Sequence, residues 1–549
     1  MYSAPSMSPS QHKWWLPGPS APDGSPQGIQ QALLHIQHPM SLVEVDGHMC
    51  AGMGGASLMG IQPPQGTPAF PLHAYAPALP IESLGSAVFR QAHRLQYAYI
   101  AGAMANGITS TEIVISMARA GMLGFFGSAG LALPEVEQAI HTLKNELGDL
   151  PFGFNLIHSP NEPALEMAVV EMYHRYNIHL VSASAYLDLT LPLVYYRVKG
   201  IHQDASGNIV CPNQVIGKVS RIEVARKFFA PPPTKLLQAL VQQGRITEQE
   251  ATLAQHIPVA NDITAEADSG GHTDNRPSIV LTPTLMALRD ACNEKYKYAR
   301  PLCVGMAGGI ATPLSAASAF AMGADYILTG TINQACQEAG TSPVVRNMLA
   351  ETQQADVTMA PAADMFEMGV KVQVLKRGTM FAQRARKLYE TYRAYKSMDD
   401  IPANLRKTLE RDYFHATLEE AWSSTCSYFQ SVDPEQIHRA EKDPKHKMAL
   451  VFRSYLGLSS RWANSGVSNR KIDYQIWCGP AMGAFNEWTR GTFLAQPEHR
   501  HVDNVAWNLL VGASYLTRIN WIRSQGVTLP SSLQSFRPMT PQQLSSILR

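Results

Sequence analysis

Short apolar runs alternate with amphipathic stretches between about residues 95 and 355. Eight such runs occur, at residues 97–103, 122–127, 151–157, 178–185, 214–220, 258–267, 301–306 and 325–330. The stretches between them have helical periodicity, and several begin at Ser or Thr and end at Gly or Asn. Buried strands that alternate with helices predict a parallel sheet. Eight strands over roughly 250 residues predict an α/β fold of the (β/α)8 TIM barrel type. A doubly wound open sheet has the same periodicity and is the alternative.

The regions on either side of this pattern differ from it. Residues 1–92 are rich in Pro, Gly, Ser and Met, which predicts a Pro/Gly-rich N-terminal arm wrapped over the barrel. The alternating piece SLVEVDGHM within it could be a strand or a docking segment. From 361 to 549 helical periodicity with aromatic residues predicts a C-terminal helical domain. The barrel is therefore assigned to 93–360, and the turn signal DASGN predicts a small insertion near 186–212, beside the barrel mouth.

The composition narrows the functional classes. The chain of 549 residues is 45% hydrophobic and 16% charged, with a formal net charge of +1, which argues against a nucleic-acid binder. No apolar window reaches the length of a membrane span, and the N-terminus lacks the pattern of a secretory signal. The seven cysteines are dispersed, without CxxC or zinc-ligand spacing. This pattern predicts a cytoplasmic protein with reduced thiols and no structural metal.

Reactive groups of such barrels lie at the C-terminal ends of the strands. The first run continues as AGAMANGIT, whose small residues leave room for a flat ligand. Asn155 is a polar residue in the apolar third run, and Lys218 is a cation in the fifth, where an unpaired charge would be costly. A bound anion or an electron-rich ring would explain Lys218, and pairing with a nearby carboxylate is the alternative.

The seventh and eighth runs each end at glycine and lead into a helix. Gly308 and Gly309 lie in VGMAGGIATP, and Gly330 and Thr331 lie in GADYILTGTINQ. Backbone N–H groups at such strand ends and at helix N-termini bind anions, which predicts a phosphate site. A dinucleotide GxGxxG fingerprint with a later acidic partner is absent, so the pattern favours a mononucleotide. The sixth run ends in ADSGGH, which contains His272.

In order, the motifs AGAMANGIT, PFGFNLI, VIGKVSRIEVARK, DSGGH and AGGIATPLSAASAFAMGADYILTGT resemble the nitronate monooxygenase-like FMN barrels over about residues 95–350. That family includes flavin-dependent enoyl-acyl carrier protein reductases. YLGLSSRWA and DYQIWCGPAMGAFNEWTRGTFL resemble the additional helical region of a narrower group. This group comprises enoyl reductase subunits of polyunsaturated fatty acid synthases and trans-acting reductases of polyketide synthases. The lead-in to the histidine departs from the commoner EAGGH form, because Ser269 follows Asp268.

The resemblance implies an FMN site and a catalytic residue. His272 falls on the active-site histidine of the family; a structural brace to Asp268 or Asp274 is the alternative. The implied FMN contacts are Ala103, Met104 and Ala105 under the isoalloxazine, Asn155 and Lys218 at the ring or ribityl chain, Gly270 and Gly271 beside the flavin, and Gly308, Gly309, Gly330 and Thr331 at the phosphate.

The implied activity is reduction of trans-2-enoyl thioesters carried on an acyl carrier protein. Hydride would pass from NADPH, or NADH, to FMN and then to the β-carbon, while His272 stabilises the enolate oxygen or moves the α-proton. A homodimer is expected from the family. Six basic residues could receive the acidic carrier protein or could be an ordinary solvated helix face. They are Lys371, Lys376, Arg377, Arg384, Arg386 and Lys387.

Three other functions compete with this interpretation. A nitronate monooxygenase-like oxidase would use the same FMN and histidine with O2 as acceptor. A non-catalytic scaffold protein of a synthase complex would bind no flavin. A purine-nucleotide dehydrogenase would use Cys336 as nucleophile, but that cysteine lies in a segment that looks helical, where a buried thiol is usually inert.

Overall fold

Eight parallel strands close into a barrel in the computed structural model, which describes residues 13–158 and 163–548. The order around the barrel is β12-β13-β15-β16-β6-β7-β8-β9. The strands are β6 (Tyr99–Ala101), β7 (Leu123–Phe126), β8 (Gly153–Ile157), β9 (Leu180–Ser184), β12 (Gln214–Val219), β13 (Asp262–Glu266), β15 (Cys303–Ala307) and β16 (Ile327–Thr329). Each lies within one of the eight predicted runs or extends one residue past it. The predicted TIM barrel is confirmed, and the open-sheet alternative is wrong.

Helices surround the barrel, and the eighth helix of this ring comes from a segment near the C-terminus of the chain. Seven helices come after barrel strands along the chain: α3 (Thr111–Arg119), α4 (Leu133–Leu147), α5 (Pro163–Arg175), α6 (Leu191–Val198), α7 (Ile222–Phe229), α10 (Ser278–Tyr296) and α11 (Pro313–Ala321). The long helix α19 (Val502–Ser524) packs against both α11 and α3. A Cβ atom at Gly512 would lie 2.6 Å from Cβ of Pro313, so only glycine allows this approach. A segment assigned to the C-terminal domain therefore completes the barrel.

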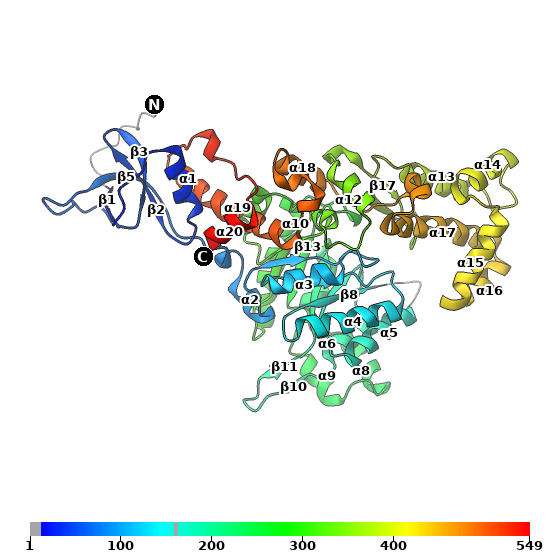
Figure 1. Cartoon of the computed structure of the whole chain (residues 1–549). Coiled ribbons are helices and arrows are strands. Elements are labelled where there is room, and N and C mark those ends of the chain that lie inside the picture. The colour runs from blue at the N-terminus through cyan, green and yellow to red at the C-terminus, as the bar shows by residue number, and fades with distance from the viewer. Residues whose placement is uncertain (1–12, 159–162, 549) are drawn as a thin grey trace.

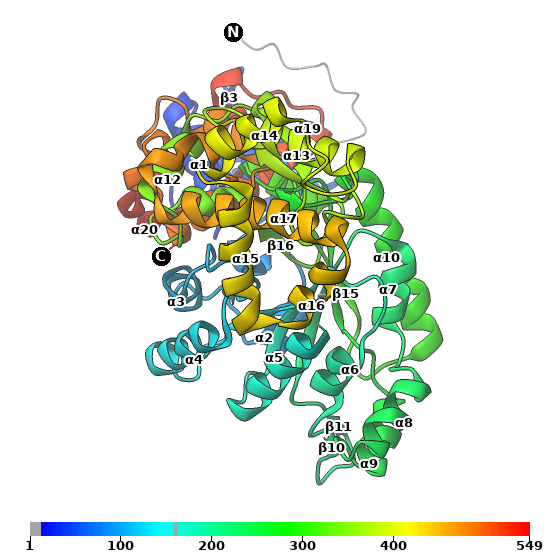
Figure 2. The ribbon, with the colours of Figure 1, turned by 90° about the vertical axis from the view of Figure 1, so that its right-hand side faces the viewer.

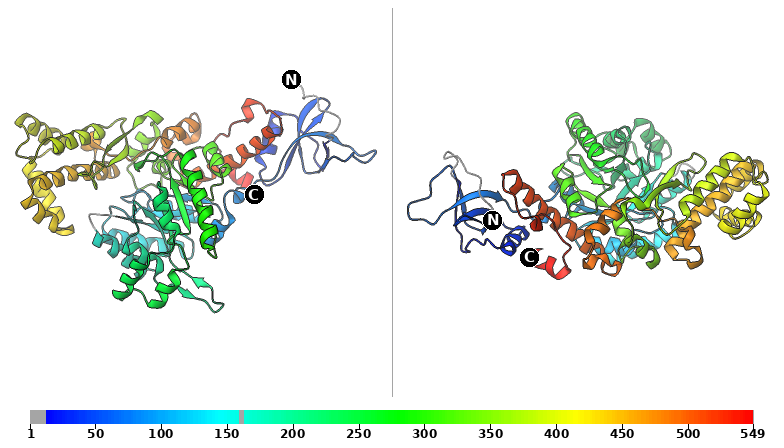
Figure 3. Two further views of the ribbon diagram at one scale, coloured as in Figure 1. Left: turned by 180° about the vertical axis from the view of Figure 1, so that it is seen from behind. Right: turned by 90° about the horizontal axis from the view of Figure 1, so that it is seen from above.

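Residues 13–76 form a folded unit, so the prediction of an extended arm wrapped over the barrel was wrong. Five antiparallel strands in the order β3-β2-β5-β1-β4 form its sheet. They are β1 (Lys13–Leu16), β2 (Met40–Val45), β3 (His48–Met53), β4 (Ala56–Met59) and β5 (Phe70–Ala76), with helix α1 (Pro26–Leu34) beside them. Asp46 and Gly47 both have positive φ, which is typical of a tight hairpin turn, so SLVEVDGHM is a hairpin. The unit contacts α19 and projects away from the barrel (Figures 1 and 3).

The predicted insertion lies at the opposite end of the barrel from the mouth. Its α6 is the ordinary barrel helix after β9, and the extra element is the hairpin of β10 (His202–Gln203) and β11 (Ile209–Val210). Because α6 returns the chain to the start of β12, the hairpin lies at the N-terminal ends of the strands (Figure 1). The expected position beside the mouth was therefore wrong. At the same end, α2 (Ala87–His93) places Phe89 against Tyr326 with ring centroids 4.1 Å apart.

A helical region lies at the mouth end of the barrel and extends to one side of it (Figures 1 and 2). Its helices are α12 (Pro343–Ala350), α13 (Phe381–Ala394), α14 (Ala403–Thr408), α15 (Leu418–Val432), α16 (Glu435–Lys442), α17 (Pro444–Ser465) and α18 (Ala481–Thr489). The predicted helical region is confirmed, except that β18 (Lys371–Leu375) is a strand where the sequence indicated helix. It forms a hairpin with β17 (Val357–Pro361), which lies at the end of the range assigned to the barrel. The remaining helices are α8 (Thr234–Gln242), α9 (Glu248–Ala254) and α20 (Pro541–Leu548). None of the helices in the described ranges combines the length and apolar character needed to cross a bilayer.

Candidate active site

The barrel gathers most of the predicted site residues at the C-terminal ends of its strands. Ala103, Met104 and Ala105 follow β6, and their side chains are half-buried. The Oγ1 of Thr109 accepts from the N–H of Met104 at 2.9 Å and donates to the carbonyl of Gly102 at 2.7 Å. A Cβ atom at Gly127 would lie 1.7 Å from the Met104 carbonyl oxygen. The loop is thus pressed against the end of β7 as a thin platform of fixed position.

Asn155 links two neighbouring strands at the mouth. Its buried side-chain amide donates to the carbonyl of Ser182 at 3.0 Å and to Oγ of Ser184 at 3.3 Å, both on β9. Its main-chain carbonyl accepts from the hydroxyls of Ser128 and Tyr173, each at 2.8 Å. These bonds account for a polar residue inside an apolar strand. Its predicted contact with a flavin stays a prediction.

Lys218 pairs with a carboxylate that the sequence did not single out. Its Nζ lies 2.8 Å from Oε1 of Glu266 on the neighbouring strand β13. The two side chains are 22% and 19% exposed, so the pair sits at the border of the barrel interior. The alternative of a paired lysine is what the structure shows, and a contact between Lys218 and a flavin stays a prediction. In the sequence, Glu266 lies near the end of the sixth apolar run, and no motif marked it as a partner of Lys218.

The loop that carries His272 is held by residues beyond the barrel. Strand β14 (Gly271–His272) pairs antiparallel with β18, His272 opposite Val372. Gly271 has a φ of +79°, a conformation that favours glycine. A Cβ atom at Gly270 would lie 2.9–3.0 Å from backbone atoms of Cys478. The absence of a side chain at Gly270 thus allows the backbone of the C-terminal region to approach, whereas the sequence had indicated a close approach of the flavin.

His272 forms a dyad with Asp364, which lies in the loop between β17 and β18. Nε2 of His272 is 3.1 Å from Oδ1 of Asp364, and the histidine side chain is 41% exposed. Desolvation lowers the pKa of His272, but the hydrogen bond and charge of Asp364 and the charge of Glu266 outweigh it, so the pKa lies above its ordinary value. The same hydrogen bond outweighs desolvation at Asp364 and lowers the pKa of that carboxyl. The dyad therefore favours an imidazolium facing a carboxylate.

The two aspartates near His272 have structural roles, but neither braces the histidine, so that alternative was wrong. Oδ1 of Asp268 accepts from Nε2 of Gln373 at 2.9 Å and from Nδ2 of Asn275 at 2.8 Å. Asp274 accepts from Oγ of Ser220 at 2.6 Å and from Nε of Arg221 at 2.9 Å. The hydrogen bond from Arg221 is the main cause that lowers the pKa of Asp274 to about 2. These bonds tie the loop to β18 and to the end of β12.

The glycines after β15 and β16 leave bare backbone at two adjacent strand ends. Gly308 and Gly309 have φ values of +84° and +79°. A Cβ atom at Gly308 would lie 2.7 Å from the carbonyl carbon of Ala267, whereas at Gly309 or Gly330 it would meet no heavy atom within 4 Å. Oγ1 of Thr331 accepts from the N–H of Gly479 at 3.4 Å. Open space beside exposed backbone suits one phosphate group.

A family model described as nitronate monooxygenase matches residues 88–412. The chain belongs to the nitronate monooxygenase family. A second model, the inserted helical domain of acyl-carrier-protein S-malonyltransferase, matches residues 395–474, which include α14 to α17. The helical region at the mouth end of the barrel therefore resembles a domain found in a different enzyme family.

Two relatives of this family member are named for polyketide biosynthesis and for polyunsaturated fatty acid synthesis. Polyketide biosynthesis protein PksE of Bacillus subtilis (strain 168) is 46% identical over 436 residues, 79% of this chain and 56% of PksE. A polyunsaturated fatty acid synthase polypeptide of Thraustochytrium sp. is 44% identical over 448 residues, 80% of this chain and 30% of that polypeptide. The chain thus spans about half of the first relative's length and less of the second's.

A solved structure matches in fold and sequence. It is the enoyl reductase domain of MlnA from the macrolactin biosynthesis cluster of Bacillus amyloliquefaciens, with a TM-score of 0.76 and 41% identity. The match covers 80% of this chain and 99% of that domain. Together with the relatives, it confirms the resemblance to synthase-associated enoyl reductases that the sequence motifs indicated.

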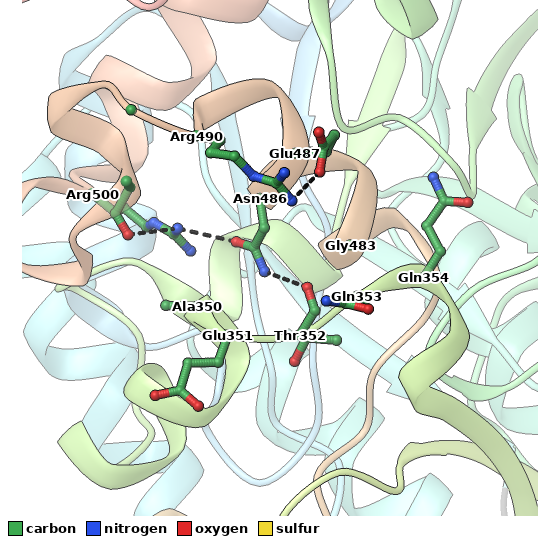
Figure 4. A pocket seen from close by; sticks show the side chains of 12 residues that line it. Ala350, Glu351, Thr352, Gln353, Gln354, Gly483, Asn486, Glu487, Arg490 and Arg500 are labelled. Atoms are coloured by element: carbon green, nitrogen blue, oxygen red, sulfur yellow. Dashed lines mark hydrogen bonds and ion pairs between the residues drawn. The ribbon is translucent and has the colours of Figure 1, made fainter.

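A cavity of about 440 Å³ between the end of α12 and α18 holds none of the predicted site residues (Figure 4). Nε of the buried Arg500 donates to the carbonyl of Leu494 at 2.8 Å, and Nη2 donates to Oδ1 of Asn486 at 3.0 Å. Desolvation lowers the pKa of Arg500 to about 10, which leaves it charged at neutral pH. Its hydrogen bonds fasten α18 to the turn that precedes α19, which is a structural role.

Cys336 does not suit the nucleophile role of the dehydrogenase alternative. It follows a short 3-10 helix (Thr331–Ala335), where a longer helix was expected, and it is fully buried. Burial raises the pKa of its thiol well above the ordinary value. Because the thiolate is the reactive form, this environment opposes nucleophilic chemistry.

Replacing Asp364 by asparagine is expected to shift the pH dependence of catalysis. In this variant only the charge of Glu266 still raises the pKa of His272, whereas desolvation and the charge of Lys218 lower it. The pKa of His272 therefore falls. If the protonated imidazole is the active form, the activity of Asp364→Asn declines at a lower pH than that of the wild type as the pH is raised. Above pH 7 the variant should be several-fold less active than the wild type. Rates of enoyl thioester reduction from pH 5.5 to 9 measure the shift. Asp364→Glu should restore much of the wild-type profile; superimposable Asp364→Asn and wild-type profiles would contradict the assigned role.

Proposed function

We propose that this protein is an FMN-dependent enoyl reductase that acts in trans on trans-2-enoyl thioesters of an acyl carrier protein, with NADPH or NADH as reductant. The observation that carries the proposal is the His272–Asp364 dyad beside the strand ends of a barrel of this family. Similarity to the MlnA enoyl reductase domain and to synthase polypeptides supports the reaction class.

The strand ends fit a flavin mononucleotide. The platform at 103–105 is thin, and the bare backbone at Gly309 and Gly330 leaves room for one phosphate group. Lys218, held by Glu266, adds a cation at the edge of the barrel interior. When bound, the cofactor supplies hydride transfer from the nicotinamide to the β-carbon of the thioester, chemistry that no side chain provides.

His272 supplies the proton chemistry in this proposal. Its Nε2 donates to Asp364, so Nδ1–H of the imidazolium is the group left to face the substrate. That N–H can donate a hydrogen bond to the thioester oxygen as enolate charge develops, or transfer its proton to the α-carbon. The carboxylate of Asp364 fixes the ring orientation and stabilises the charged form. The raised pKa of His272 favours the protonated form of this donor.

The absorption spectrum of the purified protein tests the proposal. We expect a flavin spectrum that NADPH bleaches anaerobically and that a crotonyl thioester restores. Rapid recovery with air, independent of any thioester, would instead favour a nitronate oxidase, the activity named by the family model. A colourless protein that retains no flavin would favour a scaffold role.

A further inference from the structure

A second cavity opens beside the carboxylate that binds His272. It measures about 150 Å³ and lies between the loop that joins β17 to β18 and the helices α16 and α17, which extend to one side of the barrel in Figure 1. Residues that line it include Asp364, Glu367, Met368, Gln436, Arg439 and Arg453. It is thus built jointly by the β17–β18 hairpin and the region that matches the malonyltransferase inserted domain.

Asp364 connects this cavity to the reaction site. Its carboxylate accepts from Nε2 of His272 at 3.1 Å and also lines the cavity. A substrate whose carbonyl oxygen meets the imidazole of His272 therefore has the cavity within reach of the chain attached to that carbonyl. A carrier-bound thioester has two chains at that carbonyl, the acyl chain and the pantetheine arm, and the polar lining of the cavity favours the arm.

The lining suits a neutral chain with amide groups. The lining includes two carboxylates, Asp364 and Glu367, and two arginines; Glu367 lies 3.3 Å from Arg453. Gln436, whose amide is hydrogen-bonded to Asp433 and His446, and the 64%-exposed Met368 add polar and apolar surface. The two carboxylates and two guanidinium groups balance in charge, which suits the pantetheine portion of the arm, since it offers amides and methyl groups and carries no charge of its own.

Arg439 provides a cation at the border of the cavity. It is exposed on α16, and within the described part of the chain it forms no ion pair. The far end of a carrier-bound pantetheine arm carries one phosphate, which a free guanidinium binds through charge-assisted hydrogen bonds. Arg439 thus offers a partner for the only charged group of the arm.

We propose that this cavity is the subsite for the pantetheine arm of the thioester substrate, with Arg439 facing its phosphate. The inference rests on the proposed enoyl reductase function and adds the route by which the substrate arrives. The acyl carrier protein would dock beside α16, at the edge of the helical region, and the arm would extend from there past Asp364 to His272.

Met368→Trp tests the subsite, because Met368 is exposed and an indole would obstruct the cavity without replacing a core residue. The substrates are crotonyl-pantetheine and crotonyl-N-acetylcysteamine, which keeps the thioester and one amide but lacks the rest of the arm. We expect the ratio of kcat/KM for the long substrate to that for the short one to fall about tenfold. Arg411→Ala, at an exposed arginine of the same helical region that pairs with Asp412, should leave the ratio unchanged.

Arg439→Ala gives an independent measurement. Its preference for crotonyl-phosphopantetheine over crotonyl-pantetheine should fall about fivefold relative to the wild type. Ratios that stay at the wild-type value in both variants would overturn the proposal, and so would equal losses on long and short substrates. A raised KM for NADPH in flavin reduction, with thioester ratios unchanged, would assign the cavity to the nicotinamide cofactor and overturn it as well. A wild-type protein that reduces neither thioester would instead refute the proposed function, and the subsite with it.

Discussion

Replacing His272 by alanine is expected to slow reoxidation of the reduced flavin by a crotonyl thioester about 100-fold or more. An imidazole that acts as general acid or as oxyanion donor typically contributes factors of about 10² to 10⁴. The side chain is 41% exposed at the barrel mouth and hydrogen-bonded to Asp364, so it can meet a substrate while its orientation is fixed. Anaerobic stopped-flow absorbance of the prereduced protein measures this half-reaction directly.

The controls separate chemistry from cofactor loss. The flavin content of His272→Ala, read from its absorbance, shows whether the cofactor is retained. His202→Ala is the matched variant, because His202 is exposed on the hairpin at the opposite end of the barrel. A half-reaction as fast in His272→Ala as in the wild type would remove the histidine from the proposed mechanism.

Arg518→Ala is expected to lower the free energy of unfolding of the N-terminal unit by about 3–5 kcal/mol. Arg518 is fully buried on α19, where Nη1 donates to the carbonyls of Leu33 and His35 and Nη2 donates to that of His38, each at 2.9 Å. These carbonyls lie at and beyond the C-terminal end of α1, where the helix dipole favours a cation. Desolvation lowers the pKa of Arg518 to about 10, so it stays charged at neutral pH. Alanine would leave three carbonyls without this donor.

Thermal unfolding and limited proteolysis measure this effect. Early cleavage between residues 76 and 87, together with a lower melting temperature, is the expected result. Arg523→Ala is the control, because Arg523 lies on the same helix but is exposed, and its side chain hydrogen-bonds to Gln534 at 3.2 Å. If Arg518→Ala resisted heat and protease like the wild type, the N-terminal unit would be held by other contacts.

The barrel could be predicted because its signal is local. Each strand faces the barrel interior on one side and the surrounding helices on the other, so nearly all of its residues are apolar. All eight strands could therefore be located as apolar runs in the sequence. The glycines at strand ends and His272 were visible for a related reason. Parallel strands end on the same side of a sheet, so position in the chain predicted which residues would meet.

The errors concern segments whose structure depends on distant partners. Val372 and Val374 alternate as a strand should, but they lie among residues of helical periodicity, and their pairing with β17 and β14 decided the outcome. The N-terminal strands are short and separated by Gly- and Pro-rich turns, so only their mutual pairing identifies them. The place of α19 in the barrel depends on its contact with α11, at Gly512 and Pro313.

The sequence by itself determined the barrel, the bare strand ends and the histidine, since apolar periodicity and glycine positions are properties of neighbouring residues. Only the tertiary structure decided how the histidine is held: Asp364 is separated from it by 92 positions, and the two meet because β18 carries the loop of Asp364 to β14. It likewise decided that Lys218 pairs with Glu266 and that Arg518 joins α19 to the N-terminal unit. Such contacts join residues that are far apart in the sequence, so they leave no periodic pattern in it.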